Sequence, residues 1–245
     1  MHSYLIAAIV TSVASLLGQD ALAQGTQFTE AQLNRVARVV AVGYGFRPDT
    51  PMGWFVQSWA RDIFSEPLVV SYVLDRTRSD EEVGSVAIQL TSEGMPFLSD
   101  LSLRRRTEIL LHMLETTTPR ECACLTGHPR YGQNDQIIAM RQALPKLTDT
   151  DIKGFFEIIK EALLVRIRQQ DATKYRMSQE EADKTIVTIA QAVPPHLREQ
   201  WVSQLMRVES LTDAAYCDVT KTMYKAILKL SGPSASRALR FEFAQ

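Results

Sequence analysis

The spacing of apolar residues is typical of helices from residue 29 onward. Apolar side chains recur every three or four positions, as at Leu33, Val36 and Val40, and no segment shows the convincing alternation that marks a half-buried strand. We therefore expect an all-α protein, an irregular multi-helix bundle of about ten helices. A degenerate helical-repeat solenoid is the alternative, although no residue signature recurs at a fixed period.

Capping residues place the starts of several helices. A Ser or Thr followed three residues later by Glu or Gln predicts a capping box, and this pattern occurs at Thr29, Ser79, Thr118 and Ser178. The polar connection at 169–178 is the best candidate for a weak domain boundary, but it is too short to prove two domains. We expect one all-helical domain over residues 24–245.

The first 23 residues have the pattern of a secretory signal peptide. A mostly apolar run, 5–17, is shorter than a membrane span, and Ala21-Leu22-Ala23 supplies the small-x-small pattern of a cleavage site. The absence of Lys and Arg before the run departs from the usual pattern. We expect cleavage after Ala23, no lipid anchor, and a periplasmic or secreted protein; an uncleaved N-terminal anchor is the alternative.

The charge balance makes nucleic acid an unexpected partner. The 27 Lys and Arg residues are matched by 28 Asp and Glu residues, so no net field attracts a polyanion. The densest basic run is Arg104-Arg105-Arg106. We expect it to lie on a solvated helix face, with a patch for phosphate or for an acidic partner as the alternative.

The three cysteines predict one disulfide, because thiols pair in an exported protein. Cys122 and Cys124 fall in a short helix that begins after Thr118 and stops at Gly127. Positions two apart on a helix project about 200° from each other, so the two thiols cannot face the same partner. We predict a Cys122–Cys217 disulfide, with Cys124–Cys217 as the alternative.

A metal or redox role for this segment is a weaker interpretation. Cys122, Cys124 and His128, with His112 as a fourth ligand, lack the spacing of paired zinc ligands, and Pro129 indicates that His128 lies in a surface loop. A redox thiol pair would need βαβ surroundings. We therefore expect no metal and no cofactor.

The sequence carries no strong catalytic motif. Neither Gly-x-Ser-x-Gly, nor His-Glu-x-x-His, nor a phosphate-binding glycine loop occurs. Glu93, Glu115 and Glu157 are candidate acids for a muramidase-like helical hydrolase, which is the alternative function. Each of them has the setting of an ordinary solvent-facing helix residue.

Aromatic residues concentrate between positions 43 and 64. Two interpretations are open: packing of the N-terminal helices, or a recognition surface made of Tyr44, Phe46, Arg47, Trp54 and Trp59. With no catalytic motif, we expect an exported protein that acts by binding another protein. An accessory, chaperone-like or toxin-neutralising factor would fit this expectation.

Overall fold

The computed structural model describes residues 28–74, 80–169 and 175–243, and these residues form helices but no strand. The predicted all-α class is therefore confirmed. The predicted signal peptide and the predicted cap at Ser79 lie outside the described residues.

The α-helices are α3 (Glu30–Gly43), α4 (Pro51–Ser65), α5 (Pro67–Leu74), α6 (Asp80–Gly94), α7 (Asp100–Glu115), α8 (Pro119–Leu125), α9 (Gln133–Ala143), α10 (Asp149–Arg168), α11 (Gln179–Ala192), α12 (Pro195–Leu205), α13 (Asp213–Lys229) and α14 (Gly232–Arg240). Short 3-10 turns η1 (Met95–Phe97), η2 (Leu144–Lys146), η3 (Val208–Ser210) and η4 (Phe241–Phe243) connect or extend them.

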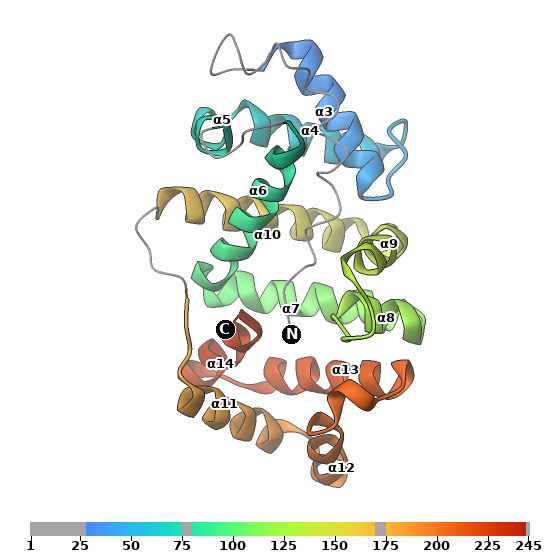
Figure 1. Ribbon diagram of the computed structural model, residues 1–245, viewed down its shortest axis with the longest axis vertical. Coiled ribbons are helices and arrows are strands. Elements are labelled where there is room, and N and C mark those ends of the chain that lie inside the picture. Colours follow the sequence, from blue (N-terminus) through green and yellow to red (C-terminus); the bar gives the residue numbers. More distant parts are fainter. Residues whose placement is uncertain (1–27, 75–79, 170–174, 244–245) are drawn as a thin grey trace.

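The helices stack along the long axis in an order that differs from their order in the chain (Figure 1). Helices α3, α4 and α5 lie at one end, α10 and α7 cross the middle, and α11 and α12 lie at the other end. Helix α7 packs on α13 and α14, which follow it at a distance in the chain. In a solenoid each repeat contacts only its chain neighbours. The architecture is therefore an irregular bundle.

Local sequence sets the helix ends where the capping pattern predicts them. Thr29, Thr118 and Ser178 each form a complete capping box in the structure. Helix α8 ends in a Schellman motif, in which the His128 N–H donates to the Ala123 carbonyl and Gly127 adopts a φ of 74°. This turn directs the chain after α8 back toward the core.

The helices on both sides of the 169–178 connection share one hydrophobic core. Its buried side chains run from Val36 in α3 to Leu239 in α14. Part of the connection lies outside the described residues. Among the described helices, none combines the length and apolar character needed to cross a bilayer.

The basic triplet does not form a solvated face, and that expectation is wrong. Arg104 donates to the Leu228 and Leu230 carbonyls at the end of α13, where a cation is favoured by the helix dipole. Arg105 forms a 2.7 Å ion pair with Asp151 of α10. Arg106 is buried and pairs with Glu242 of η4. The three side chains therefore tie α7 to three different elements.

Candidate functional site

A disulfide joins Cys122 of α8 to Cys217 of α13, with their Cα atoms 5.7 Å apart. Both residues are buried, and Cys124 is a free, buried thiol. The structure thus has the first of the two pairings predicted from the sequence. The helix separates the two neighbouring thiols as its geometry requires.

The free thiol has the surroundings of an inert cysteine. Burial raises the pKa of Cys124, and the nearby Asp135 carboxylate adds to this effect. A raised pKa lowers the thiolate fraction at neutral pH, and the thiolate is the nucleophile. Cys124 is therefore poorly suited to redox or nucleophilic chemistry.

His128 is buried, with 1% of its surface exposed, so its predicted place in a surface loop is wrong. Its Nδ1 accepts a hydrogen bond from the Arg130 N–H at 3.1 Å, and its Nε2 lies 3.1 Å from the Leu211 carbonyl. Because a carbonyl only accepts, Nε2 carries the proton. Both ring nitrogens are thus engaged in the fold. The described residues contain no group of three or more metal-ligating side chains.

Most of the predicted aromatic surface is instead core. Tyr44, Phe46 and Trp59 are buried, so these three residues cannot form an exposed recognition surface. They surround Phe156 of α10, which is fully buried, with the Tyr44 and Trp59 rings centred 4.8 and 4.7 Å away. The Trp59 indole N–H donates to the Phe156 carbonyl at 2.9 Å. The aromatic cluster therefore fastens α3 and α4 to α10.

Trp54 and Arg47 remain at the surface. Trp54 is 62% exposed and is the only aromatic residue of the described chain in the exposed class. Val42 of α3 and Ile138 of α9 are also exposed, and the α3–α4 connection lies against α9 (Figure 1). We call five exposed residues of these elements the Trp54 surface: Val42, Arg47, Trp54, Ile138 and Arg141.

The backbone that carries this surface is held tightly. The Thr50 hydroxyl donates to the Arg47 carbonyl at 2.8 Å and accepts from the Gly53 N–H, while the Gln57 amide donates to the Pro48 carbonyl. Gly45 has a φ of 85°, and a Cβ there would lie 2.3 Å from the Arg141 carbonyl oxygen. The connection is therefore fixed before any partner arrives, which lowers the entropy cost of binding.

A polar cluster at the junction of α7 and α10 was not identified from the sequence. The buried carboxylate of Asp151 accepts hydrogen bonds from Arg105, from the Thr148 hydroxyl at 3.0 Å and from Nδ1 of His112 at 3.1 Å. The Thr148-x-x-Asp151 spacing is a capping pattern, so it pointed to a helix start and not to a side-chain cluster. The His112 side chain is 51% exposed.

This cluster fixes the charge of Asp151 and the position of one proton on His112. Burial alone raises the pKa of Asp151, but hydrogen bonds from His112 and Thr148 and the charge of Arg105 outweigh it, so the pKa is lowered. Asp151 is therefore ionised, and because a carboxylate only accepts, Nδ1 of His112 carries a proton. The other ring nitrogen of His112 lies on a side chain that is half exposed.

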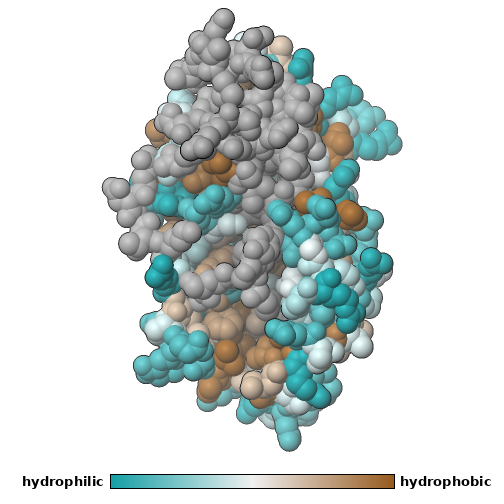
Figure 2. Space-filling model, in the orientation of Figure 1, coloured by the Kyte–Doolittle hydropathy of each residue, from teal (hydrophilic) through white to brown (hydrophobic). Residues whose placement is uncertain are grey.

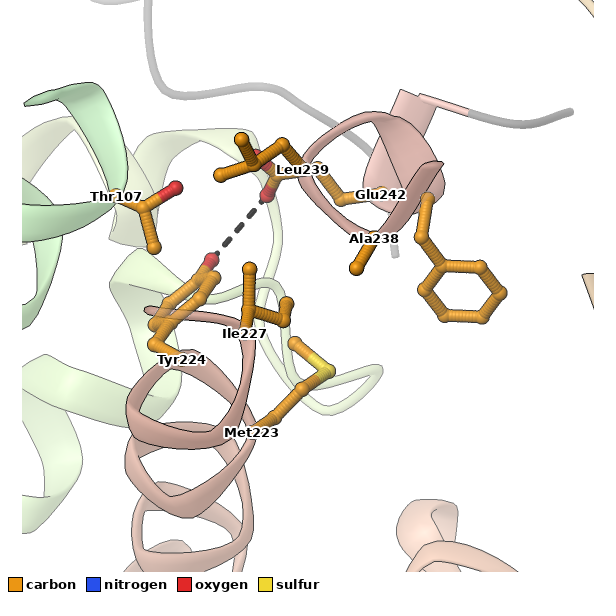
Figure 3. A pocket seen from close by; sticks show the side chains of 8 residues that line it. Thr107, Met223, Tyr224, Ile227, Ala238, Leu239 and Glu242 are labelled. Atoms are coloured by element: carbon orange, nitrogen blue, oxygen red, sulfur yellow. Dashed lines mark hydrogen bonds between the residues drawn. The ribbon is translucent and has the colours of Figure 1, made fainter. Parts of the chain in front are cut away.

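A small cavity lies between α7, α13 and the α14–η4 segment (Figure 3). Its volume is about 10 Å³, which is close to the minimum for one water molecule. Figure 3 shows Tyr224 and Glu242 pointing toward each other, with the tyrosine hydroxyl donating to the carboxylate at 3.2 Å. Glu242 also pairs with buried Arg106. A cavity of this size has no room for a glycan, and its carboxylate, that of Glu242, is already paired.

The acids considered from the sequence do not meet in one site. Glu93 pairs with Arg166 at 2.8 Å, and Glu115 pairs with Lys225 at 2.9 Å. Glu157 is exposed on α10. The first two therefore hold helices together as ion pairs.

A second apolar area lies in the other half of the molecule. Figure 2 shows apolar side chains gathered on the lower part of the viewed face, around α11, α13 and α14. Exposed apolar side chains of this half include Val187 of α11 and Val202 and Met206 at α12, with Met206 81% exposed. None of these residues is aromatic or charged.

Comparisons of the chain with protein-family models, with curated proteins and with solved structures gave no match. Any function must therefore be argued from the residues themselves.

Proposed function

We propose that this chain is an exported helical protein that acts by binding another protein through the Trp54 surface. The proposal rests on the exposure of Trp54, which lies near Arg47 on a fixed backbone. Every other described aromatic side chain is at least partly buried. Tryptophan and arginine are the residues that most often dominate binding energy at interfaces. Leaving a tryptophan in water has no benefit for the fold.

Two features support export. The sequence of residues 1–23 has the signal-peptide pattern, and the Cys122–Cys217 disulfide is of the kind that persists in an oxidising compartment. An accessory, chaperone-like or toxin-neutralising role is consistent with both.

The proposal is tested by placing a photo-cross-linking amino acid at position 54 and, as a matched control, at position 206. Both positions are exposed; residue 54 belongs to α4 and residue 206 caps α12, and these two helices lie at opposite ends of the molecule (Figure 1). A discrete adduct from the native envelope that forms at 54 and not at 206 supports the proposal. Absence of an adduct at 54, or the same adducts at both positions, contradicts it.

The His112–Asp151 pair supports a second, catalytic candidate. A carboxylate that orients a histidine and leaves its other nitrogen free is the arrangement of a general base. Ester or glycan hydrolysis by the purified protein that disappears in His112→Gln would favour this function. Hydrolysis that survives the substitution would exclude His112 as the base.

A further inference from the structure

A carboxylate from the end of the chain lies between α7 and α13. The guanidinium of Arg106, on α7, pairs with one oxygen of the Glu242 side chain. The hydroxyl of Tyr224, on α13, donates to the other oxygen at 3.2 Å (Figure 3). Both donors are buried, with 7% of Arg106 and 3% of Tyr224 exposed. Two helices therefore bring a cation and a hydroxyl to the two oxygens of one carboxylate.

These two donors need an anion between them. A buried guanidinium without a partner is costly, because water cannot hydrate it. Burial raises the pKa of Tyr224 far above its usual range, so its hydroxyl keeps the proton that it donates. The Arg106 guanidinium also lies over the Phe243 ring, 5.0 Å from the ring centroid. The fold therefore requires a carboxylate at this place, whichever molecule supplies it.

Glu242 reaches the two donors from the edge of the bundle. It belongs to η4, the short turn that ends the described part of the chain, and both neighbours of Glu242, Phe241 and Phe243, are only partly buried. Segments at a chain end stay ordered only where specific contacts tie them down. The ion pair of Glu242 is such a contact, so η4 can separate from the bundle more readily than the helices before it.

The helix that precedes η4 is fastened independently of Glu242. Arg240, at the end of α14, donates to the Pro96 and Leu98 carbonyls at 2.9 and 2.7 Å and pairs with Asp100. The helices that carry the two donors, α7 and α13, pack directly against each other. Departure of η4 would therefore leave α7, α13 and α14 in place and open the site to solvent.

We propose that Arg106 and Tyr224 form a carboxylate-binding site, which Glu242 fills from within the chain and which a carboxylate from another molecule fills once η4 has left. A small organic acid and an acidic residue of another protein segment both offer this group. The site lies on other elements than the Trp54 surface and does not depend on it. The adjoining cavity of about 10 Å³ holds about one water molecule, so the site favours a small planar anion.

The first test removes Glu242 and offers acetate. Glu242→Ala takes away one methylene group and the carboxylate, which together match acetate in size. We expect sodium acetate, compared with sodium chloride at equal ionic strength, to stabilise this variant in urea unfolding followed by tryptophan fluorescence. At acetate about ten times above its dissociation constant, the ratio of folded to unfolded chain should rise about elevenfold.

Two proteins measure the general effect of each salt on stability, because acetate also acts by exclusion from protein surfaces. The parent has its site filled by Glu242, and the Arg106→Met/Glu242→Leu variant has no guanidinium to fill. We expect neither of them to prefer acetate as Glu242→Ala does.

The second test distinguishes the two sources of the carboxylate. A labelled peptide of sequence RALRFEFAQ, which is that of residues 237–245, offers the same carboxylate between the same aromatic residues. We expect it to bind Glu242→Ala. It should bind the parent more weakly, because the parent's own Glu242 is tethered beside the site at an effective concentration of about millimolar. The peptide RALRFAFAQ, which lacks the carboxylate, should bind neither protein.

Each outcome decides the proposal. Stabilisation by acetate alone indicates a site for a small organic acid, and binding of RALRFEFAQ indicates a site for a segment of another protein. An equal preference for acetate in Arg106→Met/Glu242→Leu, or no response to acetate together with no binding of the peptide, overturns the site. A Glu242→Ala variant as stable as the parent in chloride also overturns it, because Arg106 would then need no anion. The peptide measurement on the parent decides even where Glu242→Ala does not fold.

Discussion

The Cys122–Cys217 disulfide gives the sharpest prediction, because its effect can be worked out from chain length. The bond links residues separated by 95 positions. In the chain-entropy model, closing a loop of this length destabilises the unfolded state by about 4–5 kcal/mol. We therefore expect the Cys122→Ala/Cys217→Ala variant to lose at least this much free energy of unfolding, since both cysteine side chains are also buried.

The assay is urea unfolding followed by circular dichroism, with the parent measured under oxidising and reducing conditions. At a slope of roughly 2–3 kcal/mol per molar urea, the midpoint should fall by about 2 M on reduction. Reduction removes the cross-link and keeps both sulfur atoms, so it isolates the entropic effect from packing.

The Cys124→Ala variant is the matched control. It keeps the disulfide and should keep most of the reduction-dependent loss of stability. A loss below about 1 kcal/mol on reduction of the parent would refute the loop argument. Loss of the reduction effect in Cys124→Ala would show that Cys124 is the bonded cysteine in solution.

Three further predictions follow from buried side chains. Phe156→Ala should lower the free energy of unfolding by about 3–5 kcal/mol, because it empties the centre of the aromatic cluster. Trp54→Ala should stay within about 0.5 kcal/mol of the parent, because Trp54 is exposed. Equal losses in urea unfolding would contradict the placing of Phe156 in the core and Trp54 at the surface. Glu242→Ala should lower the free energy of unfolding by about 3–5 kcal/mol, because it leaves Arg106 buried and unpaired. The double variant Arg106→Met/Glu242→Leu should recover much of that loss. A double variant as unstable as the single one would count against the pair. Asp151→Asn should weaken the dependence of stability on pH in acid. The lowered pKa of Asp151 supplies stability that is present above its unfolded pKa of about 3.9 and is lost as pH falls through its folded pKa. Parallel pH profiles of stability for parent and variant would refute the role of that carboxylate.

Local features of this fold are readable from sequence because their causes are local. A capping box needs only residues three apart, and the boxes at Thr29, Thr118 and Ser178 formed as predicted. The separation of Cys122 from Cys124 follows from the helical repeat alone. Each of these predictions uses an interaction within one helical turn.

Burial depends on partners that are distant in sequence, and several predictions of exposed positions were therefore wrong. Arg106 has the neighbours of a solvated residue, yet Glu242 meets it from 136 positions away. His128 follows a glycine turn that usually leads to the surface, but Tyr216 packs over its ring with centroids 4.5 Å apart. Trp54 and Trp59 share one aromatic run, and only the position of α10 decides which of them is exposed.

The pairing of Arg106 with Glu242 also bears on how the chain folds. A bundle packed in this way without Glu242 would leave the buried guanidinium of Arg106 unpaired, which is costly. Cys122 likewise cannot form its disulfide until α13, which carries Cys217, lies beside α8. The central helices therefore cannot reach their final packing ahead of the segments that follow them. The stability of the central helices is therefore gained only when the segments that are synthesised last have been added.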